Sequence, residues 1–128
     1  MFMVSLNCLL SVGEVLDKIS ILQIKLEEIK DFNKLIEIKK ELISLTGLCE
    51  KELKGYLEEV SKLKVVNKRL WDIEDAIRKK EKEKCFEESF IALARSVYIE
   101  NDQRFKLKDE INKKFGSVIS EQKSYEEY

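Results

Sequence analysis

Residues 11–29 read SVGEVLDKISILQIKLEEI, and this stretch decides the fold class. It opens with the Ser-x-x-Glu form of a capping box, in which the Ser11 hydroxyl and the Glu14 carboxylate satisfy free backbone amides at a helix start. Apolar residues then recur at alternating spacings of four and three, the period of one helix face. The stretch therefore predicts an amphipathic helix that begins next to Ser11. Its apolar stripe consists of Val15, Ile19, Leu22, Leu26 and Ile29.

The same predicted helix has apolar residues on a second side, because Ile21 and Ile24 point away from the stripe. A helix with apolar side chains on two sides is expected to be covered on two sides. This pattern fits a helix at the centre of the fold and equally fits a contact between two copies of the chain. A homodimer is therefore one of the two expectations.

A second helix is predicted from Asp31, whose side chain suits the cap position. Its apolar stripe keeps the helical rhythm from Leu35 to Leu63, which predicts a long arm of a helical hairpin. Gly47 and Gly55 are points where this arm can bend, since glycine in a helix costs about 1 kcal/mol relative to alanine.

Two further helices follow. The third contains the apolar positions between Val66 and Ile77 and ends in the charged run 79–84, which we interpret as a solvated helix end or turn. The fourth is predicted from about Glu87 to Phe115. Gly116 follows it and is well placed as the left-handed residue after a helix.

The composition agrees with this helical pattern. The 128 residues include 44% apolar and 38% charged side chains, four glycines and no proline, which favours long amphipathic helices. We predict an all-α fold, an antiparallel bundle of about four helices with a long helical hairpin. The whole chain, 1–128, is expected to form one domain, with an N-terminal segment at 1–10 and an irregular tail at 117–128.

The charge balance and the cysteines bear on partners and location. Lysine and arginine number 24 against 25 acidic residues, so no general field attracts nucleic acid or anionic lipid. The first ten residues are apolar but resemble neither a signal peptide nor a membrane span. Cys8, Cys49 and Cys85 are far apart and odd in number, which indicates reduced thiols. We expect a cytoplasmic protein with no nucleic-acid or membrane partner.

The absence of histidine from the sequence limits the chemistry. It excludes histidine-based triads and the common zinc ligand sets, so acid and base work would fall to carboxylates or lysine. Glu14, Asp17, Glu27, Glu28 and Asp31 place carboxylates on successive turns, as a magnesium site in an all-helical nucleotide pyrophosphatase requires. The order of the acidic groups is reversed relative to that enzyme class. We therefore interpret them as a solvated acidic face, and predict no metal and no cofactor.

The candidate site lies where the apolar face of the fourth predicted helix becomes polar. Asn101, Arg104 and Lys108 project from the middle of the face that also carries Phe90, Val97 and Ile111. Charged groups are seldom left unpaired in a core, so a partner for the two cations is expected. The third predicted helix offers a polar stripe from which Glu74 can face Arg104 or Lys108. That stripe consists of Asn67, Trp71, Glu74 and Arg78.

Two interpretations of this cluster stay open. In one, the charged residues form a salt-bridge network that fixes the register of the helices. In the other, they line a pocket in which Arg104, Lys108 and Arg78 attract an anion, while Trp71 forms an apolar wall and the asparagines donate hydrogen bonds. The candidate ligand-binding residues are Asn67, Trp71, Glu74, Arg78, Asn101, Arg104 and Lys108.

Several runs of this sequence resemble a bacterial and phage family catalogued as a domain of unknown function, DUF6165. They are residues 11–25, 66–78, 93–104 and 108–112, followed by 116–117 and 121–125. The resemblance covers nearly the whole chain but implies no established activity, cofactor or ligand. The family's motif positions are mostly polar, and several coincide with the polar stripes described above. They are Glu14, Asp17, Lys18, Asn67, Trp71, Glu74, Asp75, Arg78, Arg95, Tyr98, Asn101, Asp102 and Arg104.

Three functions of different classes are compatible with these patterns. The one we favour is a non-catalytic helical module, a dimer in our expectation, that binds a small anionic ligand or a protein partner through the polar groove. The second is a small enzyme in which Glu74 or Asp102 acts as general acid or base, while Arg104 and Lys108 hold a phosphate or carboxylate. The third is an assembly protein whose second apolar side meets another helix.

Overall fold

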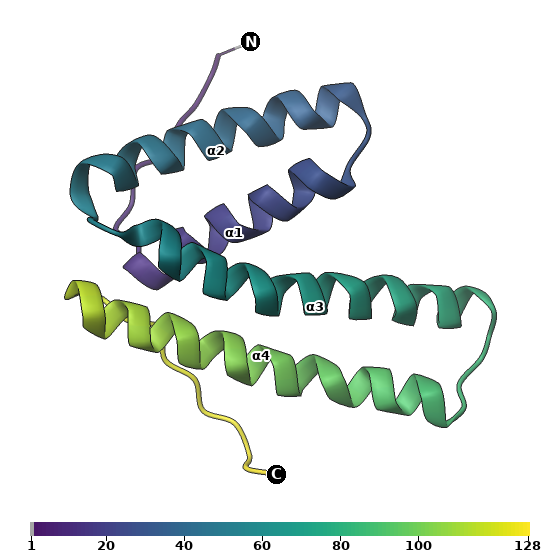
Figure 1. Ribbon diagram of the computed structural model, residues 1–128. Coiled ribbons are helices and arrows are strands. Elements are labelled where there is room, and N and C mark those ends of the chain that lie inside the picture. Colours follow the sequence, from purple (N-terminus) through teal and green to yellow (C-terminus); the bar gives the residue numbers. More distant parts are fainter. Residues whose placement is uncertain (1) are drawn as a thin grey trace.

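The fold consists of two helical hairpins. The computed structural model describes residues 2–128 and, within that range, contains α-helices and no strand. Figure 1 shows that α1 and α2 form one antiparallel hairpin and that α3 and α4 form a second, longer one. α1 packs against all three other helices, so it is the central element. The predicted all-α bundle is confirmed. The helices are α1 (Val12–Glu28), α2 (Phe32–Glu52), α3 (Tyr56–Lys82) and α4 (Glu88–Phe115).

The predicted helix ends agree with the structure at three places. The Ser11 hydroxyl accepts a hydrogen bond from the backbone N–H of Glu14 at 3.2 Å. Asp31 accepts one from the N–H of Lys34 at 3.0 Å. Gly116 follows α4 in the left-handed conformation, with φ 64° and ψ 45°. The Glu14 side chain, predicted to complete the capping box, instead accepts a hydrogen bond from Lys108.

The boundary between α2 and α3 differs from the prediction. The arm expected to run to Leu63 ends at Glu52, and α3 starts at Tyr56, after Gly55 reverses the chain in a left-handed conformation with φ 75°. α2 continues without a break through Gly47, the other possible bend point. The apolar rhythm hid the turn, because residues on both sides of it pack into the same core cluster. That cluster consists of Val15, Leu16, Ile19, Cys49, Tyr56, Val60, Leu63 and Ile111.

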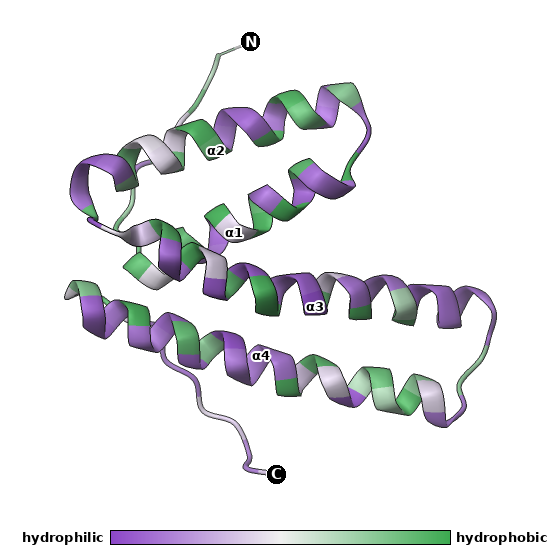
Figure 2. Cartoon of the chain, viewed as in Figure 1, coloured by the Kyte–Doolittle hydropathy of each residue, from purple (hydrophilic) through white to green (hydrophobic). Residues whose placement is uncertain are grey.

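The central position of α1 explains its second apolar side. Ile24 is only 1% exposed, although it lies off the stripe, because the fold covers α1 from two directions. Figure 2 shows apolar and polar residues alternating along all the helices, as expected when each helix turns one face inward. Ile21, the other residue of this side, is only partly buried. At Ile24 the fold itself therefore covers the side of α1 that the assembly hypothesis assigned to a partner.

The two ends of the chain extend from this bundle. Residues 2–10 are extended and exposed; Met1, the first residue of the predicted N-terminal segment, lies outside the described residues. Residues 117–128 contain no helix and return along α4. No helix in the described chain is long and apolar enough to cross a membrane.

Candidate functional site

A buried carboxylate on α1 organises the candidate site. Asp17 is 0% exposed and accepts hydrogen bonds from Arg104 on α4, with the Arg104 Nε at 3.0 Å from Asp17 Oδ1. Arg104 Nη2 donates to Asp17 Oδ2, which makes the pair bidentate. Asn67 on α3 donates to Asp17 Oδ1 at 2.8 Å and to the Ser20 hydroxyl at 2.7 Å. One carboxylate thus joins three helices.

The structure corrects two sequence expectations about carboxylates. Glu74 does not pair with Arg104 or Lys108, because it accepts a hydrogen bond from Arg78 at 2.8 Å on the exposed face of α3. Asp17, interpreted from sequence as part of a solvated face, is the partner of Arg104. A signal for this was present, since Gly13, Asp17, Ser20 and Ile24 follow a helical spacing on the second side of α1. Small and polar residues on that side indicate a close polar contact.

Lys108 occupies the next turn of α4 and is also enclosed by carboxylates. Its side chain is 6% exposed, and its Nζ lies 2.7 Å from Glu14 Oε2 and 2.8 Å from Glu121 Oε2. Asp17 Oδ2 lies farther away, at 3.9 Å. Burial alone lowers the pKa of Lys108, but the hydrogen bonds to Glu121 and Glu14 outweigh it, so the pKa is raised. The hydrogen bond to Asp17 likewise raises the pKa of Arg104. Both cations stay charged.

The start of α1 lies directly on the backbone of α4. A Cβ atom built on Gly13 would lie 2.7 Å from the carbonyl oxygen of Lys108, so only glycine fits there without a shift. The Gly13 N–H donates to the Asn112 side chain at 2.7 Å, and the Val12 N–H donates to the Ser117 hydroxyl at 3.1 Å. This close approach brings Glu14 and Asp17 within reach of the two cations.

A cavity of about 280 Å³ opens beside this network, where α1, α3 and α4 meet. Four apolar side chains form much of its wall: Ile21, Ile24, Leu70 and Val97. Five of the seven candidate residues line it as well: Asn67, Trp71, Glu74, Asn101 and Arg104.

The other two candidates lie elsewhere. Lys108 borders a second, more polar cavity of about 180 Å³, whose lining also includes Arg104, Glu121 and Lys123. Arg78 lines neither cavity, and its side chain is 76% exposed. The sequence pattern thus identified residues that lie close together in the fold. It did not identify their ion-pair partners, which lie on α1 and in the C-terminal tail.

Arg104 has donors left for a further partner. A guanidinium carries five N–H groups, and the contacts with Asp17 engage Nε and Nη2. Nη1 lies 3.5 Å from the Asn101 side-chain oxygen, a long contact, and both residues line the 280 Å³ cavity. Asp17 therefore fixes the orientation of a donor that borders an apolar space.

Metal-ligating groups are not gathered at this site. Within residues 2–128 no cluster of three or more aspartate, glutamate or cysteine side chains is arranged to hold a metal ion. Glu27 and Glu28, at the end of α1, pair with Lys64 and Lys68 on α3. The carboxylates of α1 are thus divided between the two cations of α4 and the surface of α3.

Comparison with known proteins gives one match. No curated protein and no solved structure matches the chain. The model of a family of unknown function, DUF6165, matches residues 6–128, which agrees with the resemblance seen in the sequence. Because the match spans nearly the whole chain, this protein belongs to the DUF6165 family.

Proposed function

We propose that this protein is a non-catalytic binding module whose 280 Å³ cavity takes a small molecule with one carboxylate or phosphate group and an apolar body. The observation that supports this is the Arg104 side chain, which the buried Asp17 holds in place and which lines an otherwise largely apolar cavity. A few convergent polar groups in an apolar cleft are typical of ligand sites.

The size of the cavity sets the size of the proposed ligand. An enclosed apolar cavity of about 150 Å³ is enough to hold benzene. A cavity of about 280 Å³ can accommodate a single ring together with its acidic group. Trp71 offers the flat wall for that ring, and Asn101 can donate a second hydrogen bond to the acidic group.

Charge compensation shapes how such a ligand would be held. Asp17 pairs with Arg104, and Glu14 and Glu121 pair with Lys108, so these two cations and three carboxylates have a formal charge of −1 and leave no excess positive charge. An acidic ligand would gain affinity from directional hydrogen bonds and apolar contact rather than from long-range attraction. The ion-pair network and the binding site are therefore compatible, because the network fixes the donor that the ligand meets.

A thermal-shift titration with benzoate and phenyl phosphate, each compared with benzamide, tests this function. A ligand at 100 times its dissociation constant stabilises the folded state by about 2.7 kcal/mol, which shifts the melting temperature measurably. We expect the acidic probes to stabilise the wild type and benzamide to have little effect. Trp71→Ala should abolish the shift, whereas the matched control Arg78→Ala, outside the cavity on the same helix, should retain it. Equal shifts in both variants would exclude this cavity as the site.

Self-association is a second proposal, with a new structural basis. Ile24 no longer argues for a partner, but Phe32, Ile36 and Ile43 share one face of α2 and are 74%, 47% and 70% exposed. Their spacing is that of a helical stripe, which Lys39 interrupts, and exposed apolar side chains on one helix face are a feature of interfaces between copies. We propose that a second copy covers this face. Light scattering after size exclusion should give a dimer mass for the wild type and a monomer mass for Ile43→Lys.

A further inference from the structure

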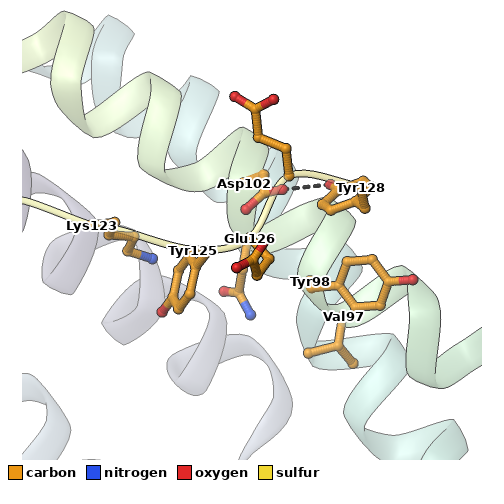
Figure 3. Close-up of a pocket in the computed structure, with 9 residues that line it drawn as sticks. Val97, Tyr98, Asp102, Lys123, Tyr125, Glu126 and Tyr128 are labelled. Carbon is orange, nitrogen blue, oxygen red and sulfur yellow. Dashed lines mark hydrogen bonds between the residues drawn. The ribbon is translucent and has the colours of Figure 1, made fainter.

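The C-terminal strap, residues 117–128, runs back along α4 and contacts it at successive turns. Glu121 pairs with Lys108 at 2.8 Å, and the Lys123 ammonium lies 5.3 Å from the centre of the Phe105 ring. The Tyr128 hydroxyl donates to Asp102, as the dashed line in Figure 3 shows. The strap thus has a defined path against α4.

A cavity of about 920 Å³ lies between the strap and α4, within the usual range for small-molecule sites. Three tyrosines line it, one from α4 and two from the strap, and the Tyr98 and Tyr128 rings meet edge to face with centroids 5.0 Å apart. Figure 3 shows the side chains of Tyr98, Tyr125 and Asp102 around the same space. Aromatic walls on both sides distinguish this cavity from the one beside Arg104.

The charge of this cavity is negative. Its lining includes the carboxylates of Asp102, Glu126 and Glu127 and the single ammonium of Lys123, which gives a formal charge of three negative and one positive, or −2. Acidic ligands are therefore disfavoured here. Tyrosine faces carry partial negative charge, so the rings and the carboxylates favour the same sign of ligand.

From this geometry we infer that the cavity between the strap and α4 binds a small organic cation, a primary amine or quaternary ammonium compound. One of these rings already lies near an ammonium, because the Nζ of Lys123 is 5.7 Å from the centre of the Tyr125 ring. Rings supply the cation–π contact and carboxylates supply the counter-charge. This site adjoins the proposed acid-binding cavity, because Val97 and Asn101 line both. The tyrosines and carboxylates on which the inference rests line only the cavity beside the strap.

Titration calorimetry of the full chain with choline tests the inference, with 3,3-dimethylbutan-1-ol as the neutral probe of the same shape. We expect choline to bind at least tenfold more tightly than the neutral alcohol. Tyr98→Leu should weaken choline binding about tenfold, and Asp102→Asn should weaken it to a similar extent. Trp71→Ala should leave choline affinity unchanged, because Trp71 lines the other cavity.

Three outcomes would overturn the inference. Equal affinity for choline and the alcohol would make shape, not charge, the basis of binding. Absence of choline binding would remove the site. Unchanged affinity in both Tyr98→Leu and Asp102→Asn would place choline elsewhere on the protein. If Tyr98→Leu fails to fold, as judged by circular dichroism, Glu126→Gln replaces it beside Asp102→Asn. Because the benzoate result depends on Trp71, the two proposals can fail separately.

Discussion

Arg104 and Lys108 project from neighbouring turns of one face of α4, yet they meet very different partners. Arg104 forms an ion pair with Asp17, whose side chain is 1% exposed at the centre of the bundle. Lys108 forms ion pairs with Glu14 and Glu121, whose side chains are 38% and 35% exposed. Glu121 lies on the C-terminal strap. The two cations occupy similar positions in the sequence pattern, but the carboxylate partner of Arg104 is buried and those of Lys108 are partly exposed.

This difference determines how much each ion pair matters for stability. A fully buried carboxylate cannot recover its hydration if its partners are lost, and the partners left behind are also desolvated. Half-exposed carboxylates can turn to water at small cost. The Asp17 pair should therefore be essential to the fold, whereas the Lys108 pairs should be replaceable.

Asp17→Ala is expected to have the largest effect. It leaves Arg104 and Asn67 without their buried acceptor, and breaking a buried ion pair costs about 3 to 5 kcal/mol. We expect a loss of about 3 kcal/mol in the free energy of unfolding, because Arg104 is 29% exposed and recovers part of its hydration. Urea denaturation followed by circular dichroism measures it.

The control for this variant is Asp72→Ala. Asp72 pairs with Lys68 on the exposed surface of α3, and exposed pairs contribute about 0.2 to 1 kcal/mol. A similar loss in both variants would mean that burial does not distinguish the two carboxylates.

The positions of the helices were predicted well from the sequence, whereas the ion-pair partners were predicted poorly, for a physical reason. Helical periodicity and capping depend on nearby residues, so Ser11, Asp31 and Gly116 were placed correctly at helix ends. Periodicity also placed Arg104 and Lys108 on the inward face of the fourth helix, where Lys108 is buried and Arg104 is half-buried. It could not identify Asp17 as the partner, because that depends on which helix packs at the centre. Gly55 was identified as a possible bend in a longer helix, but the end of that helix was not predicted, because the core contacts both sides of the turn.

Gly13→Ala should have the next largest effect. The added methyl group would lie 2.7 Å from the Lys108 carbonyl oxygen, a backbone atom that cannot turn aside, so α1 and α4 must separate slightly. Overpacking of this kind costs about 1 to 3 kcal/mol. It would also lengthen the contacts of Asp17 and Glu14 with α4. Thermal unfolding of the variant should show the loss.

Gly47→Ala is the matched control. Gly47 also lies within a helix, but nothing stands within 4 Å of the position of its added Cβ. Alanine in an exposed helix interior is favoured over glycine by about 0.5 to 1 kcal/mol, so this variant should be more stable than the wild type. If Gly13→Ala were stabilising as well, the close approach of α1 to α4 would be refuted.

Lys108→Met tests the other half of the comparison. Methionine keeps much of the buried stem of lysine, while Glu14 and Glu121 return to water and Asp17 retains Arg104 and Asn67. Removing one partner of an ion pair is costly where the charge left behind is buried, but the Glu14 and Glu121 side chains are 38% and 35% exposed and can be hydrated. We expect a change within about 1 kcal/mol in urea denaturation. A loss as large as that of Asp17→Ala would show that the two cations are equally essential.

The smallest expected effect concerns pH and a third ion pair of α4. Glu59 on α3, 7% exposed, accepts a hydrogen bond from Lys114 at 2.6 Å and lies 3.5 Å from Lys62. The hydrogen bond from Lys114 lowers the pKa of Glu59 in the folded protein. Its unfolded pKa is about 4.3, so the stabilising contribution is complete above that value and is lost as the pH falls through the lower folded pKa.

Urea denaturation of the wild type and Glu59→Gln between neutral and strongly acidic pH measures this contribution. The difference between the two proteins should be largest at neutral pH and should shrink as the wild-type carboxylate becomes protonated. Glu58→Gln, at the exposed neighbouring position, should follow the wild type throughout. A difference that stays constant down to the lowest pH would mean that Glu59 stabilises the fold through its shape, and that its ion pair with Lys114 contributes little. Of Arg104, Lys108 and Lys114, only Arg104 would then have a partner whose charge the fold requires.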